Sequence, residues 1–265
     1  MDEGRMDRVS GERKWPNMLW IVRHGQSAGN VARDAAEAAG HHLIDVSMRD
    51  VDVPLSPLGE EQSTALGRWF GKMPPEERPT AVLTSTYVRA RETASLILKA
   101  AEMDADEVSF VSDERLREKE FGIIDRHTKF GISERFPTEA SRYDHLGKFY
   151  YRPPGGESWC DVILRLRSII DTLTRDYREE RVLIVGHQVV VHCFRYLLER
   201  MTEDQILAID REKNLANCSV TSYEFDPTVS KNGKLVLRLF NFVAPLEEEG
   251  AEVTRRPDVP VAPKA

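Results

Sequence analysis

The chain has 265 residues, enough for one large domain or two small ones, and a core of that size needs no disulfide to hold it. Hydrophobic residues make up 41% and charged residues 31%, the balance of an ordinary globular protein. The 37 basic and 44 acidic side chains give a net charge of −7, which excludes the basic field of a non-specific nucleic-acid binder.

No stretch reaches the roughly 20 apolar residues of a membrane span, and the start of the chain lacks an apolar run of signal-peptide length. Cys160, Cys193 and Cys218 are widely spaced and predict reduced thiols, not a disulfide framework or a zinc site. We therefore expect a cytoplasmic protein with no nucleic-acid and no membrane partner. The sequence leaves its oligomeric state open.

Short apolar runs rich in β-branched residues predict buried strands at 18–23, 80–85 and 181–186, with a weaker strand near Phe110. Two late strands, at 219–225 and 234–242, flank Asn232-Gly233 and predict an antiparallel hairpin.

Helical spacing of apolar residues predicts four helices that alternate with these strands. Ser56-Pro57 is a start signal for the first, and the third begins near Glu157. The other two run from about Val88 to Ala101 and onward from His187. This alternation predicts a three-layer α/β/α fold with a mostly parallel central sheet.

Three regions lie outside the alternation. We expect a polar extension at 1–17, one domain at 18–244, and a disordered tail at 245–265 that is rich in Glu and Pro. Within the domain, 31–51 and 122–152 look like insertions, and we expect the second to be a long irregular substrate loop.

Candidate chemistry gathers where the predicted strands end. His24 and His187 each follow a strand, and ligands of open α/β sheets bind at the carboxyl ends of strands. Arg23 precedes His24, and Arg89 follows the strand at 80–85. Two histidines and two arginines suit a phosphoryl group, since the guanidinium fork pairs with phosphate oxygens and neutral imidazole is a competent nucleophile. Gly25 would leave room for that group to approach.

Any one of these residues alone is more often structural, so the inference depends on the set. Four motifs in order resemble those of the histidine phosphatase superfamily, also called phosphoglycerate mutase-like. They are Arg23-His24-Gly25 with Asn30, Tyr87-Val-Arg89-Ala90-Arg-Glu-Thr93, Leu116-Arg-Glu118-Lys-Glu-Phe-Gly122, and Val185-Gly186-His187. The segments around Asp52-Val-Pro-Leu55 and Gly155-Gly-Glu-Ser158 also resemble recurrent segments of that family.

The resemblance implies a phosphoglycerate mutase-like fold and a division of labour. His24 would become phosphohistidine, while Arg23, Arg89 and His187, with Asn30 nearby, would hold the phosphoryl oxygens. Glu118 would protonate the leaving oxygen and then help to activate water. Glu120 is a rival acid, but it would point the opposite way if the stretch is extended. No metal and no cofactor are implied.

The substrate is less well determined. The stretch Gly147 to Pro154 lacks the adjacent arginine pair of the family's mutases, and Gln188, not glycine, follows His187. Both features favour the fructose-2,6-bisphosphatase and broad phosphatase branch, in which Lys148 and Gln188 fall on positions that bind sugar phosphate. Phe130 and Arg142 depart from that branch, where a tyrosine and an in-register arginine are expected.

The predicted loop at 122–152 carries more basic than acidic residues, which favours a substrate with a second anionic group, although a solvated surface of mixed charge is an equally simple interpretation. We therefore expect a metal-independent phosphomonoesterase acting on a small phosphorylated metabolite. Two alternatives stay open, a phosphoglycerate mutase-type isomerase and a non-catalytic module that binds a phosphorylated ligand.

Overall fold

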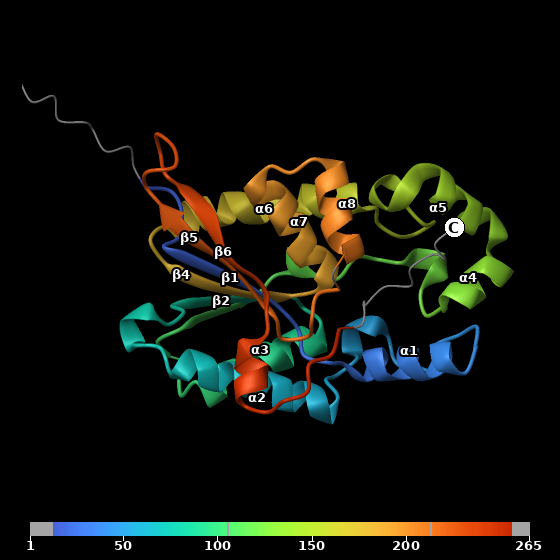
Figure 1. The fold of residues 1–265 in the computed structure, drawn as a ribbon, viewed down its shortest axis with the longest axis horizontal. Coiled ribbons are helices and arrows are strands. Elements are labelled where there is room, and N and C mark those ends of the chain that lie inside the picture. Colours follow the sequence, from blue (N-terminus) through green and yellow to red (C-terminus); the bar gives the residue numbers. More distant parts are fainter. Residues whose placement is uncertain (1–12, 105, 213, 256–265) are drawn as a thin grey trace, which may run out of the picture.

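The computed structural model describes residues 13–104, 106–212 and 214–255. Within these ranges six strands form one sheet in the order β3-β2-β4-β1-β5-β6 (Figure 1). Neighbours among β3, β2, β4 and β1 are parallel, whereas β5 is antiparallel to both β1 and β6. The mostly parallel sheet and the late hairpin are thus confirmed. The strands are β1 (Met18–Arg23), β2 (Ala81–Thr84), β3 (Ser109–Ser112), β4 (Arg181–Gly186), β5 (Val220–Asp226) and β6 (Lys234–Phe242).

The helices begin where the sequence signals place them. Ser56 accepts a hydrogen bond from the amide of Gly59 with Pro57 at the first helical position, and Ser158 and Asp161 form a reciprocal capping box. The helices of the described chain are α1 (Ala28–Ala38), α2 (Pro57–Gly71), α3 (Val88–Ala100), α4 (Lys129–Arg135), α5 (Pro137–Tyr150), α6 (Trp159–Asp176), α7 (Gln188–Glu199), α8 (Glu203–Glu212) and α9 (Ala244–Glu248).

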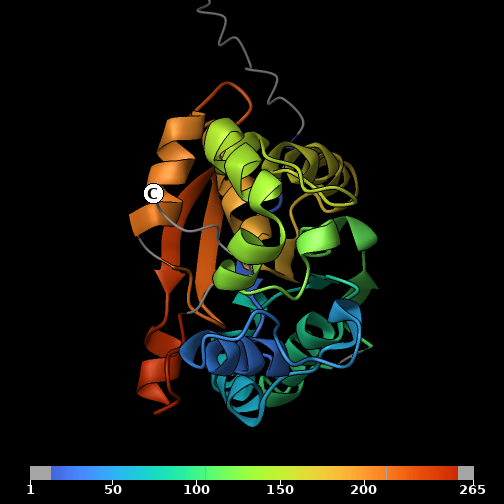
Figure 2. The same ribbon diagram turned by 90° about the vertical axis from the view of Figure 1, so that its right-hand side faces the viewer.

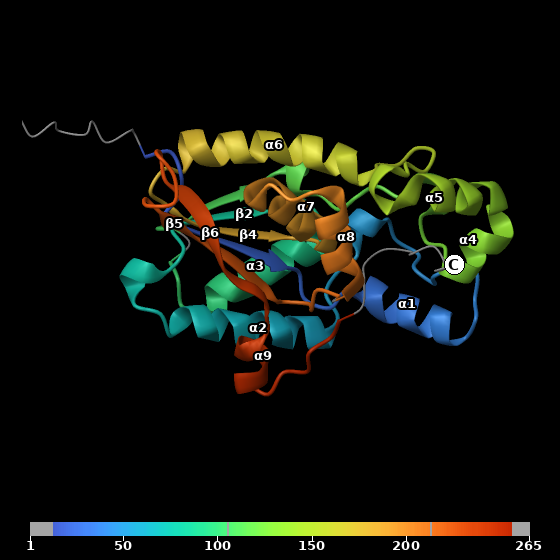
Figure 3. The same ribbon diagram turned by 45° about the horizontal axis from the view of Figure 1, so that its top comes forward.

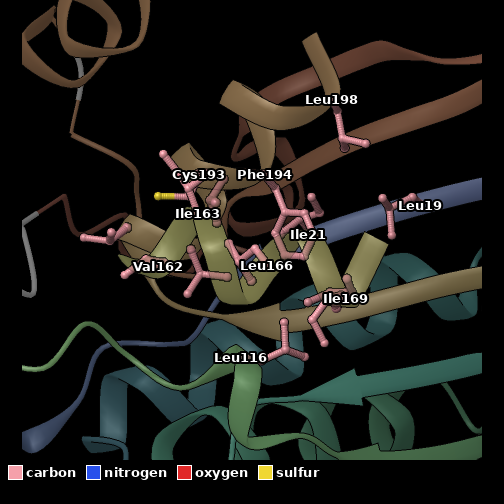
Figure 4. Close-up of a cluster of buried hydrophobic side chains, with 14 of the residues drawn as sticks. Leu19, Ile21, Leu116, Val162, Ile163, Leu166, Ile169, Cys193, Phe194 and Leu198 are labelled. Carbon is pink, nitrogen blue, oxygen red and sulfur yellow. The ribbon is translucent and has the colours of Figure 1, made fainter. Parts of the chain in front are cut away.

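The sheet lies between two helical layers (Figure 3). Because side chains alternate along a strand, Leu19 and Ile21 of β1 pack with α6 and α7, while Trp20 and Val22 pack with α2 and α3. Figure 4 shows the first cluster, in which Leu166 and Phe194 gather beside β1. Burial of each such side chain stabilises the fold by roughly 1.5–3 kcal/mol. The three-layer α/β/α prediction is confirmed.

The end of the sheet where the parallel strands finish carries the remaining helices. Figure 2 looks onto this end, with α1 on one side and α4 and α5 on the other. The prediction of an irregular loop over 122–152 was wrong in part, because α4 and α5 fill much of it. Phe121, Ile124, Ile132 and Tyr151 form a small core of their own there, and that burial supports the helices. The segment 31–51 is helical to Ala38 and irregular from there to the 3₁₀ turn at Asp50–Asp52.

The predicted disorder from residue 245 was also wrong over the part that the structure describes. Leu246 of α9 is fully buried against the α2 layer, and the side chain of Gln62 donates to the carbonyl of Glu252 at 2.8 Å. The rest of that prediction, 256–265, lies outside the described residues, as does most of the extension at 1–17. All three cysteines are described and free, and Cys193 and Cys218 are buried. Among the described helices, none is long and apolar enough to cross a membrane.

Candidate active site

Strand register brings His24 and His187 together. β1 and β4 pair in parallel with Arg23 opposite Gly186, so the residue after each strand emerges at the same height on the same edge. The two rings lie edge to face, with centroids 5.1 Å apart, and neither histidine has exposed surface. Ser85 follows the end of β2 and reaches the same point, where its hydroxyl lies 2.8 Å from His187 Nε2.

The ring of His24 has a defined orientation. Its Nδ1 lies 2.7 Å from the carbonyl oxygen of Gly25, and a carbonyl can only accept, so Nδ1 carries the proton. The lone pair is then on Nε2, where the Nε–H of Arg89 donates to it at 3.3 Å. An imidazole in this tautomer presents Nε2 as a nucleophile, directly beside a guanidinium.

Arg23 and Arg89 are buried cations, the first next to His24 in the sequence and the second in contact with its ring. Arg89 lies in the first turn of α3 with 3% of its surface exposed, and its guanidinium stacks over Tyr87 at 4.8 Å. Arg23 is fully buried at the end of β1 and donates to the carbonyl of Leu215. The guanidinium of Arg89 therefore lies directly beside His24 Nε2, where an anion would meet a positive charge.

Glu118 and Glu120 point in different directions, as the extended reading of this stretch predicts. Glu118 is 1% exposed, its Oε2 lies 3.6 Å from His187 Nδ1, and its Oε1 accepts from the amide of Lys119 at 2.7 Å. The side chain of Glu120 is 48% exposed and accepts from the hydroxyl of Tyr87 at 3.3 Å. Geometry therefore places Glu118, and not its rival, among the histidines.

The loop that carries Glu118 is braced from α6. Arg165 donates to the carbonyl oxygens of Arg115 and Glu118, at 2.5 and 3.3 Å, and also to the carboxylate of Glu157 at 3.0 Å. Glu157 in turn accepts from the amide of Glu120 at 3.1 Å. The Gly-Gly-Glu-Ser segment thus holds the candidate acid in place, a role that its sequence did not reveal.

Asn30 is held by the first turn of α1. Its side-chain oxygen accepts from the amide of Ser27 at 3.0 Å, while Ser27 Oγ accepts from the amide of Asn30 at 3.1 Å, which completes a capping box. This reciprocal pair fixes the orientation of the Asn30 amide group. The side chain is 6% exposed and lines the same cavity as Arg89.

Gly25 packs closely against α2. A Cβ at this position would lie 2.5 Å from the carbonyl oxygen of Gly59 and 2.9 Å from Ser63 Oγ, both in α2. The amide of Gly25 also donates to Thr93 Oγ1 at 3.0 Å. Glycine is therefore required here by the close approach of α2 to the Arg-His-Gly turn, whatever room it also leaves for a phosphoryl group.

With this geometry established, comparison with known proteins identifies the family. A sequence profile of the histidine phosphatase superfamily (branch 1) matches residues 19–236. The chain belongs to the histidine phosphatase superfamily.

The relatives of this chain carry different names. The chain is 30% identical over 190 residues to 6-phosphofructo-2-kinase/fructose-2,6-bisphosphatase of Gallus gallus, an alignment covering 71% of the chain and 34% of the relative. It is 25% identical over 221 residues to phosphoglycerate mutase-like protein AT74H of Arabidopsis thaliana, covering 79% and 74%. The chain thus spans about a third of the bifunctional relative and most of the second.

Solved structures agree with the fold. Bacillus stearothermophilus YhfR superposes with a TM-score of 0.66 at 25% identity, covering 86% of this chain and 98% of its own. A mycobacterial glucosyl-3-phosphoglycerate phosphatase in complex with VO3 superposes with a TM-score of 0.62 at 21% identity, covering 86% and 100%. At that identity the second likeness shows the fold alone.

The two remaining predicted residues are Gln188 and Lys148. Gln188 is the first residue of α7, directly after His187, and is 3% exposed. Lys148 of α5 pairs with Asp210 of α8, Nζ to Oδ2 at 2.5 Å, and lies 5.3 Å from the ring of Trp159. The structure therefore links Lys148 to α8 and α6 and not to the two histidines.

Three residues at the site were missed by sequence reasoning. Ser85 could have been found, since it is the last residue of the strand predicted at 80–85 and so lies at the same edge as the histidines. Lys119 is buried with its ammonium 4.6 Å from the Phe121 ring, and burial lowers its pKa to about 8. Asp50 contacts Arg89 from the segment that precedes α2, and nothing in the spacing of its motif signalled that contact.

Proposed function

We propose that this chain is a phosphomonoesterase that acts through a phosphohistidine on His24. The observation that carries the proposal is the tautomer and placement of that ring, with Nδ1–H on the Gly25 carbonyl and Nε2 facing the guanidinium of Arg89. A nucleophile set beside a permanent cation in a buried site is the arrangement that phosphoryl transfer needs, since the chemistry depends on positioning and charge stabilisation.

In the first step the Nε–H of Arg89 passes from Nε2 to a phosphoryl oxygen, the freed Nε2 lone pair attacks phosphorus, and the bond from phosphorus to the leaving oxygen breaks. Arg89 and Arg23 neutralise the charge on the non-bridging oxygens, helped by His187, which precedes the amino end of α7. The amide of Asn30, oriented by its cap, adds a neutral donor. The product of this step is an Nε2-phosphohistidine and an alcohol.

Glu118 is the group placed to move the proton. Its carboxyl lies beside His187 and is almost fully buried, so it can give its proton to the departing alkoxide. In the second step the resulting carboxylate takes a proton from water as the water attacks phosphorus. Inorganic phosphate leaves, His24 returns to its starting tautomer, and Glu118 is protonated again.

This cycle balances without any metal or cofactor, and we propose that the enzyme uses none. Its substrate is a small phosphorylated metabolite. Relatives named fructose-2,6-bisphosphatase support a sugar phosphate, although they share only about 30% of aligned residues with this chain. An isomerase remains the second candidate, because a 2,3-bisphosphoglycerate-dependent phosphoglycerate mutase of Gloeobacter violaceus is 27% identical over 74% of the chain.

One assay separates these activities. The purified chain is incubated, with and without a chelator, with a panel of phosphorylated metabolites that includes fructose 2,6-bisphosphate and 3-phosphoglycerate. We expect free phosphate to accumulate at the same rate in both conditions. Rapid interconversion of phosphoglycerates with little free phosphate would favour the mutase, and turnover of no compound would favour a binding module.

A further inference from the structure

The guanidinium of Arg89 is held by an acidic side chain from another part of the chain. Its Nη1 donates to the backbone carbonyl of Asp50 at 2.7 Å and to Asp50 Oδ1 at 3.0 Å, and Nη2 donates to Oδ2 at 3.2 Å. Together with the bond from Nε to His24, these contacts use most of the N–H donors that a guanidinium offers.

This carboxylate occupies the geometry that a phosphoryl group requires. Arginine grips carboxylate and phosphate in the same way, through two parallel N–H···O bonds from its planar fork. In the proposed cycle Arg89 must offer that fork to the oxygens around phosphorus. Asp50 already holds Nη1 and one N–H of Nη2, which leaves the Nε–H that faces His24 and the second N–H of Nη2 for a phosphoryl oxygen, and two anions held next to each other repel.

Asp50 lies in an exposed segment with little regular structure, which can move more easily than α3. It starts a 3₁₀ turn, Asp50–Asp52, after an irregular stretch in which Met48 and Arg49 are exposed, and 38% of its own side chain is accessible. Arg89, in contrast, is fixed in α3 with 4% of its side chain accessible. When the pair separates, the aspartate is the partner that moves.

A small cavity of about 50 Å³ adjoins the Asp50 carboxylate and has space for it once it leaves Arg89. The cavity is walled by three arginines, Arg33, Arg89 and Arg126, against the two acids Asp50 and Asp125. Apolar side chains complete the lining, among them Ile44, Val46 and Phe121. A carboxylate leaving Arg89 can therefore stay within reach of Arg33 and Arg126.

We infer that Asp50 and the phosphoryl group compete for the positive charge of Arg89, so that Asp50 lowers the affinity of the site for phosphate and favours release of the product. The inference rests on the proposed role of Arg89 as a phosphoryl-binding residue. Asp50 acts through Arg89 and is a residue that sets affinity, not one that touches the reacting atoms.

The test is a calorimetric titration of the full chain with inorganic phosphate at fixed pH and ionic strength. Asp50→Asn keeps the shape of the side chain and removes its charge, so we expect it to bind phosphate about tenfold more tightly, as loss of one competing charge-assisted pair implies. Asp50→Ala should shift affinity in the same direction, which decides the matter if the asparagine variant does not fold. Asp50→Glu keeps the negative charge, so its affinity for phosphate should stay close to that of the wild type.

Asp45 supplies the matched control. It lies in the same segment, is exposed, and loses the same charge in Asp45→Asn, so this variant should bind phosphate like the wild type. Unchanged or weaker binding by both the asparagine and alanine variants of Asp50 would overturn the inference, because Asp50 would then orient Arg89 for phosphate. Equal tightening in Asp45→Asn would also overturn it, as would a lack of phosphate binding in every variant. Phosphate binding needs no turnover, so the titration can be interpreted even if the chain hydrolyses no compound in the phosphatase assay.

Discussion

The rings of His24 and His187 lie 5.1 Å apart because the strands that precede them, β1 and β4, pair with Arg23 opposite Gly186. Two residues distant in sequence become neighbours through backbone hydrogen bonds alone. A shift of one residue in that register would turn the side chains that follow toward the other face of the sheet. The rigid centre of the sheet therefore sets the spacing between the proposed nucleophile and its partner.

The first prediction concerns His24 as the nucleophile. Rapid quench of the wild type with a ³²P-labelled substrate should trap a phosphoenzyme that is labile in acid and stable in alkali. His24→Ala should form none, and its kcat should fall by at least about 10³-fold, since it lacks the group that attacks phosphorus. His145 is exposed and remote from these contacts, so His145→Ala should label like the wild type. Labelling that persists in His24→Ala contradicts the assignment.

Much of this site could be predicted from sequence because its residues follow buried strands. A short run of β-branched residues predicts a buried strand. The residue after that strand must then lie at the carboxyl edge of the sheet, as His24 and His187 do. The helix starts at Ser56-Pro57 and near Glu157 were likewise visible, since the signals that begin a helix are local. The element order followed from local signals of this kind.

Contacts between distant loops could not be predicted in the same way. The hydrogen bonds of Asp50 with Arg89, and of Glu157 with the amide of Glu120, depend on how irregular segments meet after folding. The helices α4 and α5 were missed because their supporting core is small and combines residues from both ends of the region, such as Phe121 and Tyr151. Leu246 was assigned to a disordered tail from composition alone, but burial against the rest of the fold orders it.

A second prediction tests Glu118 through the leaving group. An alkoxide needs a proton as it departs, whereas nitrophenolate leaves unaided. Glu118→Gln should lower kcat/KM for an alkyl phosphate by about 10²–10⁴-fold and for nitrophenyl phosphate by far less. Glu120→Gln is the control, because that carboxylate is half exposed, and it should show no such selectivity. Equal slowing of both substrates in Glu118→Gln would mean that another group supplies the proton.

A third prediction concerns Lys148 as a site for a second anion. Lys148→Ala should raise KM for a sugar bisphosphate about tenfold, and that for a simple monophosphate much less, if its ammonium meets the second phosphate. The 2.5 Å pair with Asp210 partly neutralises this ammonium, so Asp210→Asn should change the bisphosphate KM in the opposite direction. KM values that rise equally for both substrates in Lys148→Ala would leave the lysine a purely structural partner of α8.

A fourth prediction follows from the contact between Gly25 and α2. In Gly25→Ala the new methyl group would lie 2.5 Å from the Gly59 carbonyl oxygen, so backbone must shift. Overpacking of this kind costs about 1–3 kcal/mol, and the midpoint of thermal unfolding should fall accordingly. Gly29→Ala in α1 is a milder change, since its methyl would lie 3.3 Å from a Val53 methyl and 3.6 Å from Ser27 Oγ, with no backbone atom that close. Loss of activity in Gly25→Ala without any loss of stability would favour the phosphoryl-approach explanation.

The last prediction is a pH dependence of stability that comes from His192. This ring is fully buried in α7 and stacked on Trp159 at 5.8 Å, and burial lowers its pKa to about 4 although Asp210 lies 3.7 Å from Nε2. In the unfolded chain this histidine has an ordinary pKa near 6.5. Between about pH 4 and pH 6.5 the ring is therefore protonated in the unfolded chain and neutral in the folded chain.

Stability from this group is thus fully present above about pH 6.5 and is lost as the pH falls toward 4, by about 3 kcal/mol in all. Urea unfolding of the wild type at a series of pH values should show this loss in addition to that of the carboxylates. His192→Gln does not titrate, so its free energy of unfolding should fall less steeply between pH 7 and pH 4. His145→Gln removes an exposed histidine and should keep the wild-type slope. Parallel slopes for wild type and His192→Gln would mean that the buried ring is protonated in the folded protein.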